Sequence, residues 1–246
     1  MSVIYLNITE NEFKSTSSVQ KFMPLERALQ LLKTRKLWFS NPVIWPDPFE
    51  RRFIDGEYPG GKKFTWRNRV YCMCVTTNMA SEASWKAYGD GYVVKLEFDR
   101  KELAKILDDF SKRPNVMDMF LGKMDYQQTK NIEKPLKQIK FTYGNPMKIN
   151  TKRFKASLLL LKRKAYEYEN EFRMIVVKRR QTKENGILID IPNLMTLIKS
   201  IVIGPKVENY EYEMIKDHLI TQYKFSKSKI SQSNLYKGSA NVKIKI

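Results

Sequence analysis

Hydrophobic and polar positions repeat with two different periods along the chain, which predicts a mixture of helices and strands. Leucine and alanine at helical spacing between residues 24 and 35 predict a helix that opens on Pro24. Another helix is expected after Asp99, because Asp99 and Glu102 have the spacing of an N-terminal capping box. Further helices are predicted at residues 81–88, 151–164 and 208–223.

Strands are predicted where β-branched and aromatic residues form short runs. These runs cover residues 36–40, 69–75, 92–98, 139–143, 172–177, 187–191 and 200–203. Segment 41–50 contains three prolines, so we expect a turn or loop there. Strands and helices follow no regular βαβ alternation, and no internal repeat or Gly/Ser linker interrupts them.

These elements predict an α+β fold. We expect one domain over residues 1–223, with a mostly antiparallel or split mixed sheet and flanking helices. A polar, basic C-terminal tail is expected over residues 224–246.

Composition narrows the class of protein. Hydrophobic residues make up 42% of the chain, enough for a core, and no apolar run approaches the ~20 residues of a membrane span. The first residues lack the basic and apolar regions of a secretory signal. Cys72 and Cys74, one residue apart, cannot form a disulfide framework or, alone, a zinc site. We therefore expect a soluble cytoplasmic protein that needs no metal.

The chain has one histidine, His218, within a polar stretch that reads as an exposed helix. This excludes catalysis by two histidines and disfavours a Ser-His-Asp or Cys-His arrangement. Chemistry in this protein must therefore depend on carboxylates, lysines, arginines, hydroxyls and aromatic rings.

Positive charge is concentrated in the second half of the chain, although the formal net charge of +19 belongs to the whole. Residues 130–164 contain eleven basic side chains and one acid, and residues 224–246 contain six and none. This pattern is typical either of a solvated lysine-rich surface or of a surface that binds phosphates. Under the second interpretation, both segments form one continuous positive face. The candidate nucleic-acid-binding residues are Lys152, Arg153, Lys155, Lys162, Arg163 and Lys164.

Two segments carry aromatic or acidic groups suited to a binding site. Trp38 and Ser40 lead into a turn in which Asp47 stands between two prolines, where it can cap the turn or point into a cleft. Trp85 and Tyr88 share one face of a predicted helix, as core residues or as a platform for a cofactor.

A third segment, YEYENEFR at residues 166–173, enters a predicted strand. Strand alternation would place Glu167, Glu169, Glu171 and Arg173 on one face. Either Arg173 and the preceding Lys162 and Lys164 offset the repulsion between the glutamates by pairing with them, or the glutamates stabilise a cation or bind a sugar hydroxyl.

Several motifs in order resemble a large bacterial family, the domain-of-unknown-function family twenty-nine seventy-one. The resemblance covers about residues 20–220 and rests on WFSNPVIWPDPFE, SEASWKAY, YVVKLEF, IKFTYG, YEYENEFR and IVIGP. The family usually has Asn where this chain has Pro46. It also often has Tyr-Lys-Tyr-Arg near the first strand, where this chain has Gln-Lys-Phe at residues 20–22. A site on the first strand therefore does not carry over.

The plan of that family is similar to the ADP-ribosyltransferase fold, and this likeness implies a use of NAD. By that resemblance Glu171 would bind the nicotinamide-ribose hydroxyl and stabilise the oxocarbenium ion as nicotinamide leaves, with Glu169 near the acceptor. Thr76 and Thr77 stand roughly where that fold has Ser-Thr-Ser. The implied NAD-binding residues are Trp38, Ser40, Asp47, Trp85, Tyr88 and Arg173.

Three functions remain open from the sequence. The first is an NAD-dependent ADP-ribosyltransferase-like protein, a bacterial toxin or phage-defence effector that acts on nucleic acid or protein. The second is a non-catalytic module that binds nucleic acid or a protein partner such as an antitoxin. The third is a metal-dependent nuclease built on Asp47, Glu50, Glu169 and Glu171.

The enzyme interpretation leads to two expectations, one about the structure and one about a variant. Glu171 should lie in a concave pocket lined by at least one of Trp38, Trp85 and Tyr88. Glu171→Gln should remove activity and leave the fold intact.

Overall fold

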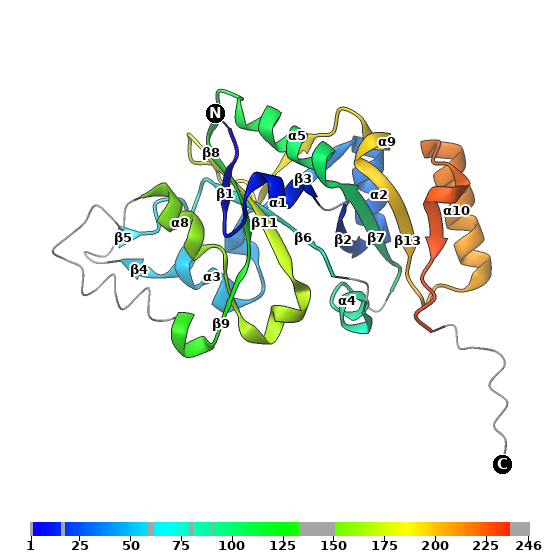
Figure 1. Cartoon of the computed structure of the whole chain (residues 1–246), viewed down its shortest axis with the longest axis horizontal. Coiled ribbons are helices and arrows are strands. Elements are labelled where there is room, and N and C mark those ends of the chain that lie inside the picture. The colour runs from blue at the N-terminus through cyan, green and yellow to red at the C-terminus, as the bar shows by residue number, and fades with distance from the viewer. Residues whose placement is uncertain are drawn as a thin grey trace, which may run out of the picture.

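The computed structural model describes residues 2–15, 18–58, 62–78, 81–89, 91–132 and 151–236. Within them one large mixed sheet forms the centre of the molecule, with helices on its faces and edges (Figure 1). The strand order is β1-β8-β11-β6-β2-β7-β13-β14, and β3 and β12 form a side branch on β6. The predicted α+β class with a mixed sheet and flanking helices is therefore confirmed.

The strands of the main sheet are β1 (Ile4–Leu6), β2 (Ser18–Pro24), β3 (Lys36–Ser40), β6 (Val70–Thr76), β7 (Val93–Asp99), β8 (Val116–Lys123), β11 (Glu171–Lys178), β12 (Gly186–Asp190), β13 (Ile198–Ile203) and β14 (Ile230–Gln232). Two small sheets pair β4 (Glu57–Tyr58) with β5 (Lys62–Lys63) and β9 (Asp125–Gln127) with β10 (Leu161–Arg163). The outer pairs β1–β8 and β13–β14 of the main sheet are parallel, and its other pairs are antiparallel.

The α-helices are α1 (Glu10–Ser15), α2 (Leu25–Thr34), α3 (Pro48–Asp55), α4 (Glu82–Lys86), α5 (Arg100–Ser111), α8 (Lys152–Leu158), α9 (Leu194–Leu197) and α10 (Asn209–Tyr223). Short 3-10 turns are η1 (Pro42–Ile44), η2 (Lys164–Glu169) and η3 (Lys227–Lys229). Among the helices described, none is long and apolar enough to cross a bilayer.

The sheet forks at β6. On one side β6 pairs with β11 over its whole length, from Val70 to Thr76. On the other side it meets β2 only through Thr76 and Gln20, and β3 only through Cys72 and Ser40. The β2–β7 and β3–β12 branches therefore separate from each other along the middle of β6, and the sheet is split, as the sequence predicts.

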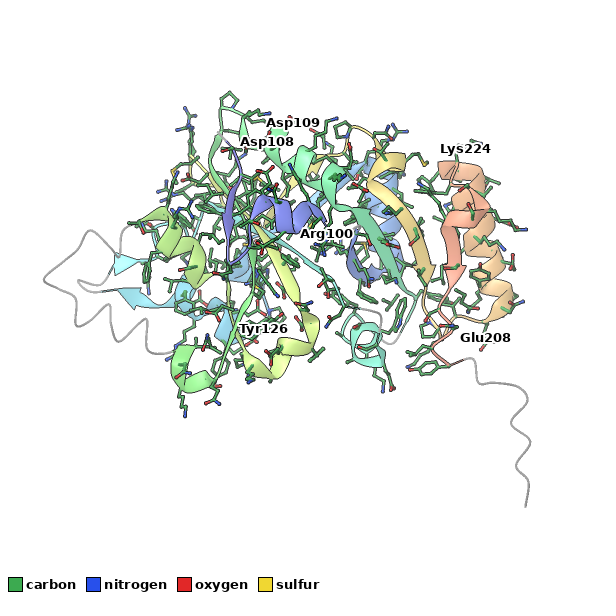
Figure 2. The ribbon with its side chains drawn as sticks, viewed as in Figure 1. Arg100, Asp108, Asp109, Tyr126, Glu208 and Lys224 are labelled. Atoms are coloured by element: carbon green, nitrogen blue, oxygen red, sulfur yellow. The ribbon has the colours of Figure 1, made fainter. Side chains whose placement is uncertain are left out.

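Two apolar clusters pack on the two faces of the central strands. Successive β6 residues alternate between them, because side chains of a strand point to opposite faces: Tyr71, Met73 and Val75 belong to one cluster and Cys72 to the other. Arg100, at the start of α5 (Figure 2), is buried and donates to the backbone carbonyls of Phe13 and Ser18. The N-terminal helix is thus attached to the sheet.

Most predicted elements are present within one or two residues, and the differences have identifiable causes. Residues 48–50, expected as the end of a loop, begin the helix α3, because Pro48 takes the first helical position and Asp47 caps the helix by accepting from the amide of Phe49 at 2.8 Å. The predicted helix over 151–164 ends at Leu158. The predicted strand at 139–143 lies outside the described residues.

The predicted C-terminal tail is partly built into the domain. Phe225 is 1% exposed in the core, and β14 adds a parallel strand next to β13. The sheet therefore extends beyond the boundary predicted at residue 223. His218 is exposed on α10, as predicted.

The two basic segments do not form one face in the described part of the chain. Helix α8 lies at one end of the long axis, whereas α10, which runs between Glu208 and Lys224, and β14 lie at the other end (Figures 1 and 2). The prediction of a single continuous positive surface is therefore wrong for the residues described.

Candidate functional site

A cleft of about 1010 Å³ lies at the fork of the sheet. Its floor comes from β6 and β11, and its walls come from β2, β3, α2 and the segment around η2. The lining includes Glu171 together with Trp38 and Tyr88, so the expected concave pocket is present. Ser40, Asp47, Glu169 and Arg173 also line it, whereas Trp85 does not.

The strand register explains why these groups meet. Directly opposite residues in neighbouring strands point to the same face, and residues two apart in one strand share a face. Glu171 is opposite Thr76, and Arg173 is opposite Cys74. On the other edge of β6, Ser40 is opposite Cys72. The acidic start of β11 and the polar end of β3 therefore share one face of the sheet.

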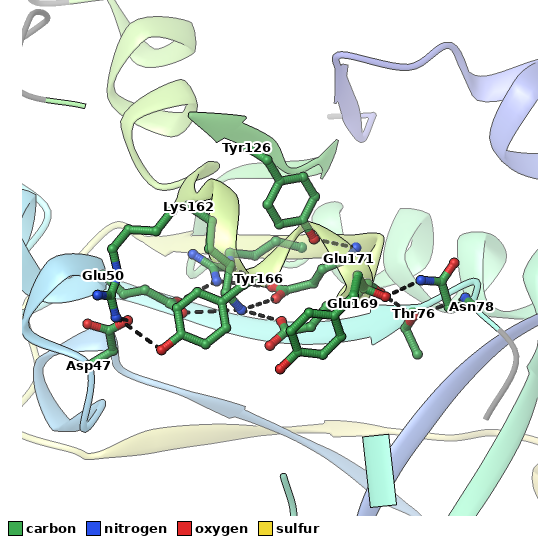
Figure 3. Close-up of polar contacts among 12 residues, drawn as sticks. Asp47, Glu50, Thr76, Asn78, Tyr126, Lys162, Tyr166, Glu169 and Glu171 are labelled. Atoms are coloured by element: carbon green, nitrogen blue, oxygen red, sulfur yellow. Dashed lines mark hydrogen bonds and ion pairs between the residues drawn. The ribbon is translucent and has the colours of Figure 1, made fainter. Parts of the chain in front are cut away.

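Lys162 stands between three carboxylates at the floor of the cleft (Figure 3). Its Nζ donates to Glu171 Oε2 at 2.7 Å, lies 3.3 Å from Glu50 Oε1, and forms a further ion pair with Glu169. The Lys162 side chain is 8% exposed and that of Glu171 is 6% exposed, whereas that of Glu169 is 28% exposed. The Glu50 side chain is 14% exposed, so one cation holds a buried carboxylate and two that solvent reaches to different extents.

Arg173, on β11, is the second cation of the cluster. Its Nη2 donates to Glu171 Oε1 at 3.0 Å and to Glu50 Oε2 at 2.6 Å, and its Nη1 donates to the Leu159 carbonyl. The guanidinium also lies 4.4 Å from the centre of the Trp45 ring. These hydrogen bonds and the ring contact together fix the plane of the guanidinium. Arg173 therefore holds the carboxylate of Glu171 in place.

The charges of the cluster shift its pKa values in opposite directions. Burial alone would raise the pKa of Glu171, but Arg173 and Lys162 outweigh it and hold that pKa at about 2. Burial raises the pKa of Glu169, and Lys162 only partly offsets this effect. Burial would lower the pKa of Lys162, yet Glu171 and Glu50 raise it. Glu171 is therefore ionised at neutral pH, while Glu169 is the more easily protonated of the two.

The thiol of Cys74 faces the same cluster and is not a nucleophile there. Burial and the neighbouring Glu171 raise the pKa of Cys74 to about 12, so it stays protonated at neutral pH. Its carbonyl accepts from Lys21 Nζ at 2.9 Å, which brings a cation from β2 to the middle of β6.

A second ion pair closes the neighbouring wall. Arg163 Nη2 donates to Asp47 Oδ2 and to the Tyr166 hydroxyl, both at 3.0 Å, and the guanidinium lies 4.2 Å from the centre of the Phe49 ring. Asp47 therefore both caps α3 and binds Arg163. Its two oxygens serve the fold rather than pointing freely into the cleft.

The turn that carries Glu169 is attached to the end of β6. Asn170 adopts a left-handed conformation with φ 41°, and its side-chain amide donates to the Thr77 hydroxyl. The Thr76 hydroxyl donates to the Glu169 carbonyl, and Asn78 donates to the Tyr168 carbonyl. Thr76 and Thr77 thus position the glutamate turn and do not line the cleft.

Several predicted site residues have other roles. Trp85 is 4% exposed and packs edge-on against Phe22 at 5.0 Å between ring centres, so it is a core residue. Glu167 and Glu169 lie in η2, not in the strand, so the predicted row of alternating acids is wrong.

The predicted nucleic-acid-binding residues have two kinds of surroundings. Lys162 is held in the cleft by carboxylates, and Arg163, whose side chain is 27% exposed, is paired with Asp47 beside it. Lys152, Arg153 and Lys164 are exposed and Lys155 is half-buried. Lys152 pairs with Asp118 at 2.6 Å.

The sequence also missed parts of the site. Lys21 lines the cleft from the first strand of the fork, and Tyr166 and Tyr168 line it from η2. Tyr126 is half-buried and does not line the cleft, and its hydroxyl accepts from the backbone amide of Glu171 at 2.8 Å (Figure 3). Residues 18–23 do not alternate strictly between polar and apolar types, so no local pattern indicates Lys21.

Comparison with protein families adds one match. The model of the family described as "Protein of unknown function (DUF2971)" matches residues 84–174. This segment runs from α4 to the beginning of β11 and contains Lys162, Glu169, Glu171 and Arg173. The resemblance to that family, expected over about residues 20–220, is therefore confirmed over residues 84–174.

Searches of curated proteins and of solved structures returned no match.

Proposed function

We propose that the cleft binds NAD and that the protein cleaves the nicotinamide–ribose bond, with transfer of ADP-ribose to an acceptor. The observation that carries this proposal is the convergence of Glu169 and Glu171 on one lysine within a cleft at the fork of a mixed sheet. The ADP-ribosyltransferase-like fold that the sequence resembles belongs to the same proposal.

The two glutamates differ in the way that this reaction requires. As the C–N bond breaks, nicotinamide leaves with the bonding electron pair and the ribose carbon becomes cationic. Glu171 has a pKa of about 2, so it is a permanent negative charge close to where that cation would develop. The acceptor's hydroxyl or amine then bonds to the ribose carbon and must lose a proton. Glu169 is partly exposed and has a raised pKa, which suits a group that accepts this proton.

Lys162 sets a condition on this chemistry. Because it neutralises part of the negative charge of Glu171, the full field of that carboxylate reaches a substrate only when the lysine leans toward Glu50 or Glu169. The proposal thus assigns Lys162 a positioning role and keeps the glutamates as the groups that touch substrate.

The remaining lining of the cleft is compatible with a dinucleotide. Lys21 and Arg27 line it and offer positive charge to a diphosphate. Tyr88 and Tyr168 are 44% and 46% exposed, so their rings offer apolar surface to a flat ligand.

The metal-dependent nuclease has less support. Asp47, Glu50, Glu169 and Glu171 each face a lysine or arginine, so side-chain cations stand where a metal ion would need to be. Among the described residues, no group of three His, Cys, Asp or Glu side chains is arranged to hold a metal ion.

The test is nicotinamide release from NAD by the wild type and by Glu169→Gln. We expect at least a 100-fold decrease in turnover, because an amide cannot accept the proton. Glu167→Gln is the matched control, since Glu167 is an exposed glutamate of the same 3-10 turn and does not line the cleft. Equal turnover of wild type and Glu169→Gln would contradict the role of Glu169. A wild type that neither binds nor cleaves NAD would favour the non-catalytic binding module.

A further inference from the structure

One aromatic residue of the cleft is exposed although its neighbours in the strand are buried. Leu37 and Phe39 of β3 are 0% exposed and belong to the core, whereas Trp38 between them is 49% exposed and lines the cleft. Strand alternation accounts for the opposite directions, but not for an indole left open. The tryptophans at positions 66 and 85 are 3% and 4% exposed.

A glycine on the neighbouring strand makes room for this ring. A Cβ atom added at Gly186 would lie 2.2 Å from Cζ2, 2.4 Å from Cη2 and 2.6 Å from Cε2 of Trp38. The six-membered ring therefore lies against the backbone of Gly186, and no larger residue fits there with the ring in this place. One side of the indole is supported by β12, and the exposed remainder faces the cleft.

The open surface continues on the same strand pair. Leu188 is the cross-strand partner of Trp38, is 47% exposed and lines the same cleft. Lys36, two residues from Trp38 in β3, also lines the cleft, so a cation lies on the same strand as the exposed indole, and Arg27 of α2 lines the cleft as well. A flat apolar surface with basic neighbours suits a base that is attached to a phosphate.

We propose that Trp38 stacks the base of a nucleotide, and that this base is the adenine of the dinucleotide bound at the glutamates. The inference rests on the proposed function for the identity of the dinucleotide, and it names the subsite. Gly186 and Leu188 are the residues that support it.

The separation between Trp38 and Glu171 indicates which base of the dinucleotide stacks on Trp38. Strand β6 lies between β3 and β11, so two interstrand spacings of ~4.8 Å, about 10 Å, separate the backbones of β3 and β11 at the fork. The gap widens beyond Ser40, because β3 pairs with β6 at no other residue. A ring on Trp38 is therefore too far from Glu171 to be the one whose bond to ribose breaks there. The second base of the dinucleotide, joined through the diphosphate, takes this place.

The experiment is acrylamide quenching of tryptophan fluorescence with adenosine monophosphate or nicotinamide mononucleotide present. Trp38 is exposed, Trp45 is half-buried in the same cleft, and Trp66 and Trp85 are buried, so the part of the protection that Trp38→Ala removes reports on Trp38. We expect adenosine monophosphate to protect and nicotinamide mononucleotide to protect far less. Because the readout is binding, it does not depend on whether NAD is cleaved.

Substitutions at Trp38 and Gly186 test whether these residues bind the base. Trp38→Ala should weaken adenosine monophosphate binding, measured by calorimetry, by about 5- to 150-fold, which corresponds to ~1–3 kcal/mol per stacked base. Trp38→Phe should recover part of it, because a smaller ring still stacks. Gly186→Ala should weaken binding while Trp38 is still present, and a melting curve establishes that this variant is folded. Tyr210→Ala is the control, since Tyr210 is an exposed aromatic residue on α10, far from the cleft.

Two results would overturn the inference. One is equal binding of adenosine monophosphate by wild type and Trp38→Ala. The other is stronger protection by nicotinamide mononucleotide, which would reverse the order of the bases. Protection by adenosine monophosphate in a protein that leaves NAD intact would support the stacking site and count against the proposed transferase activity alone.

Discussion

Two neighbouring basic stretches of the chain have opposite surroundings in the structure. Lys152, Arg153 and Lys155 are on α8 at one end of the molecule, where the first two are exposed. Lys162 and Arg163, only seven residues further along, are on β10 and lie against carboxylates in the cleft. Both stretches look alike in the sequence, so basic character alone does not indicate a surface.

The difference arises from partners that are distant in sequence. Arg163 pairs with Asp47 and Lys162 with Glu50, both from the segment around α3, more than 110 residues earlier. A buried cation is stable only where carboxylates are already positioned for it, whereas an exposed one is solvated by water. The cleft cations therefore fix the relative positions of α3, β10 and β11, whereas on α8 Lys152 pairs with Asp118 and Arg153 is exposed to water.

Removing the central cation should have the largest effect. Lys162→Met leaves Glu171 and Glu50 with Arg173 as their shared partner in a buried site, so we expect the free energy of unfolding to fall by about 3–5 kcal/mol. Urea denaturation followed by circular dichroism measures it. Lys164→Met, an exposed residue two positions away, is the control and should change stability by less than about 0.5 kcal/mol. Similar losses in both variants would remove the distinction between the two stretches.

Acid should weaken the cleft in a defined range. The folded-state pKa of Glu171 is lowered from 4.5 to about 2, so its contribution to stability is complete above pH 4.5 and is lost as the pH falls toward 2. At ~1.4 kcal/mol per unit of pKa, the loss is about 3 kcal/mol. Denaturation between pH 6 and pH 2 measures it.

The control is Glu171→Gln, which cannot titrate and should show a shallower decline over this range. Because Glu171 is buried between two cations, this variant should also be less stable at pH 7. The expectation from sequence that it leaves the fold intact therefore gives way to a loss of both activity and stability. Parallel pH profiles of wild type and variant would contradict the pKa of Glu171.

Local sequence signals predicted most of the fold and part of the cleft. The 24–35 helix, the capping of α5 by Asp99 and the strand at β11 follow from periodicity and caps, which depend on near neighbours. Glu169 and Glu171 were identified as site residues because their strand-entry motif is local as well. The place of Lys21 in the cleft could not be predicted, because it depends on which distant strands meet at the fork. For Trp85 and Lys162 the sequence left two interpretations open, and the structure agrees with a core residue and with a lysine that pairs with the glutamates.

Asp47 should give a smaller effect that separates its two roles. Asp47→Ala removes both the cap of α3 and the partner of Arg163, and the loss of the cap alone costs about 1 kcal/mol. Asp47→Asn keeps an oxygen that can accept from the Phe49 amide, so it should retain the cap and lose mainly the ion pair. Melting temperatures of the two variants decide between these roles. A larger loss for Asn than for Ala would show that the cap has little importance.

The smallest effect on stability is expected at α8, and there the measurement is binding. Arg153→Gln and Lys155→Gln should each change the free energy of unfolding by about 0.5 kcal/mol or less, because Arg153 is exposed and Lys155 is half-buried. If α8 contacts nucleic-acid phosphates, the logarithm of affinity for duplex DNA should fall by about 0.9 per log unit of salt for each phosphate contacted. Each substitution would then lower that slope by about 0.9.

Anisotropy titrations at two salt concentrations measure the slope, and Lys162→Gln, whose cation is directed into the cleft, should leave it unchanged. Absence of binding at low salt would show that the α8 charges are a solvated surface. A slope that changes with Lys162→Gln and not with Arg153→Gln would reverse the assignment of the two basic stretches.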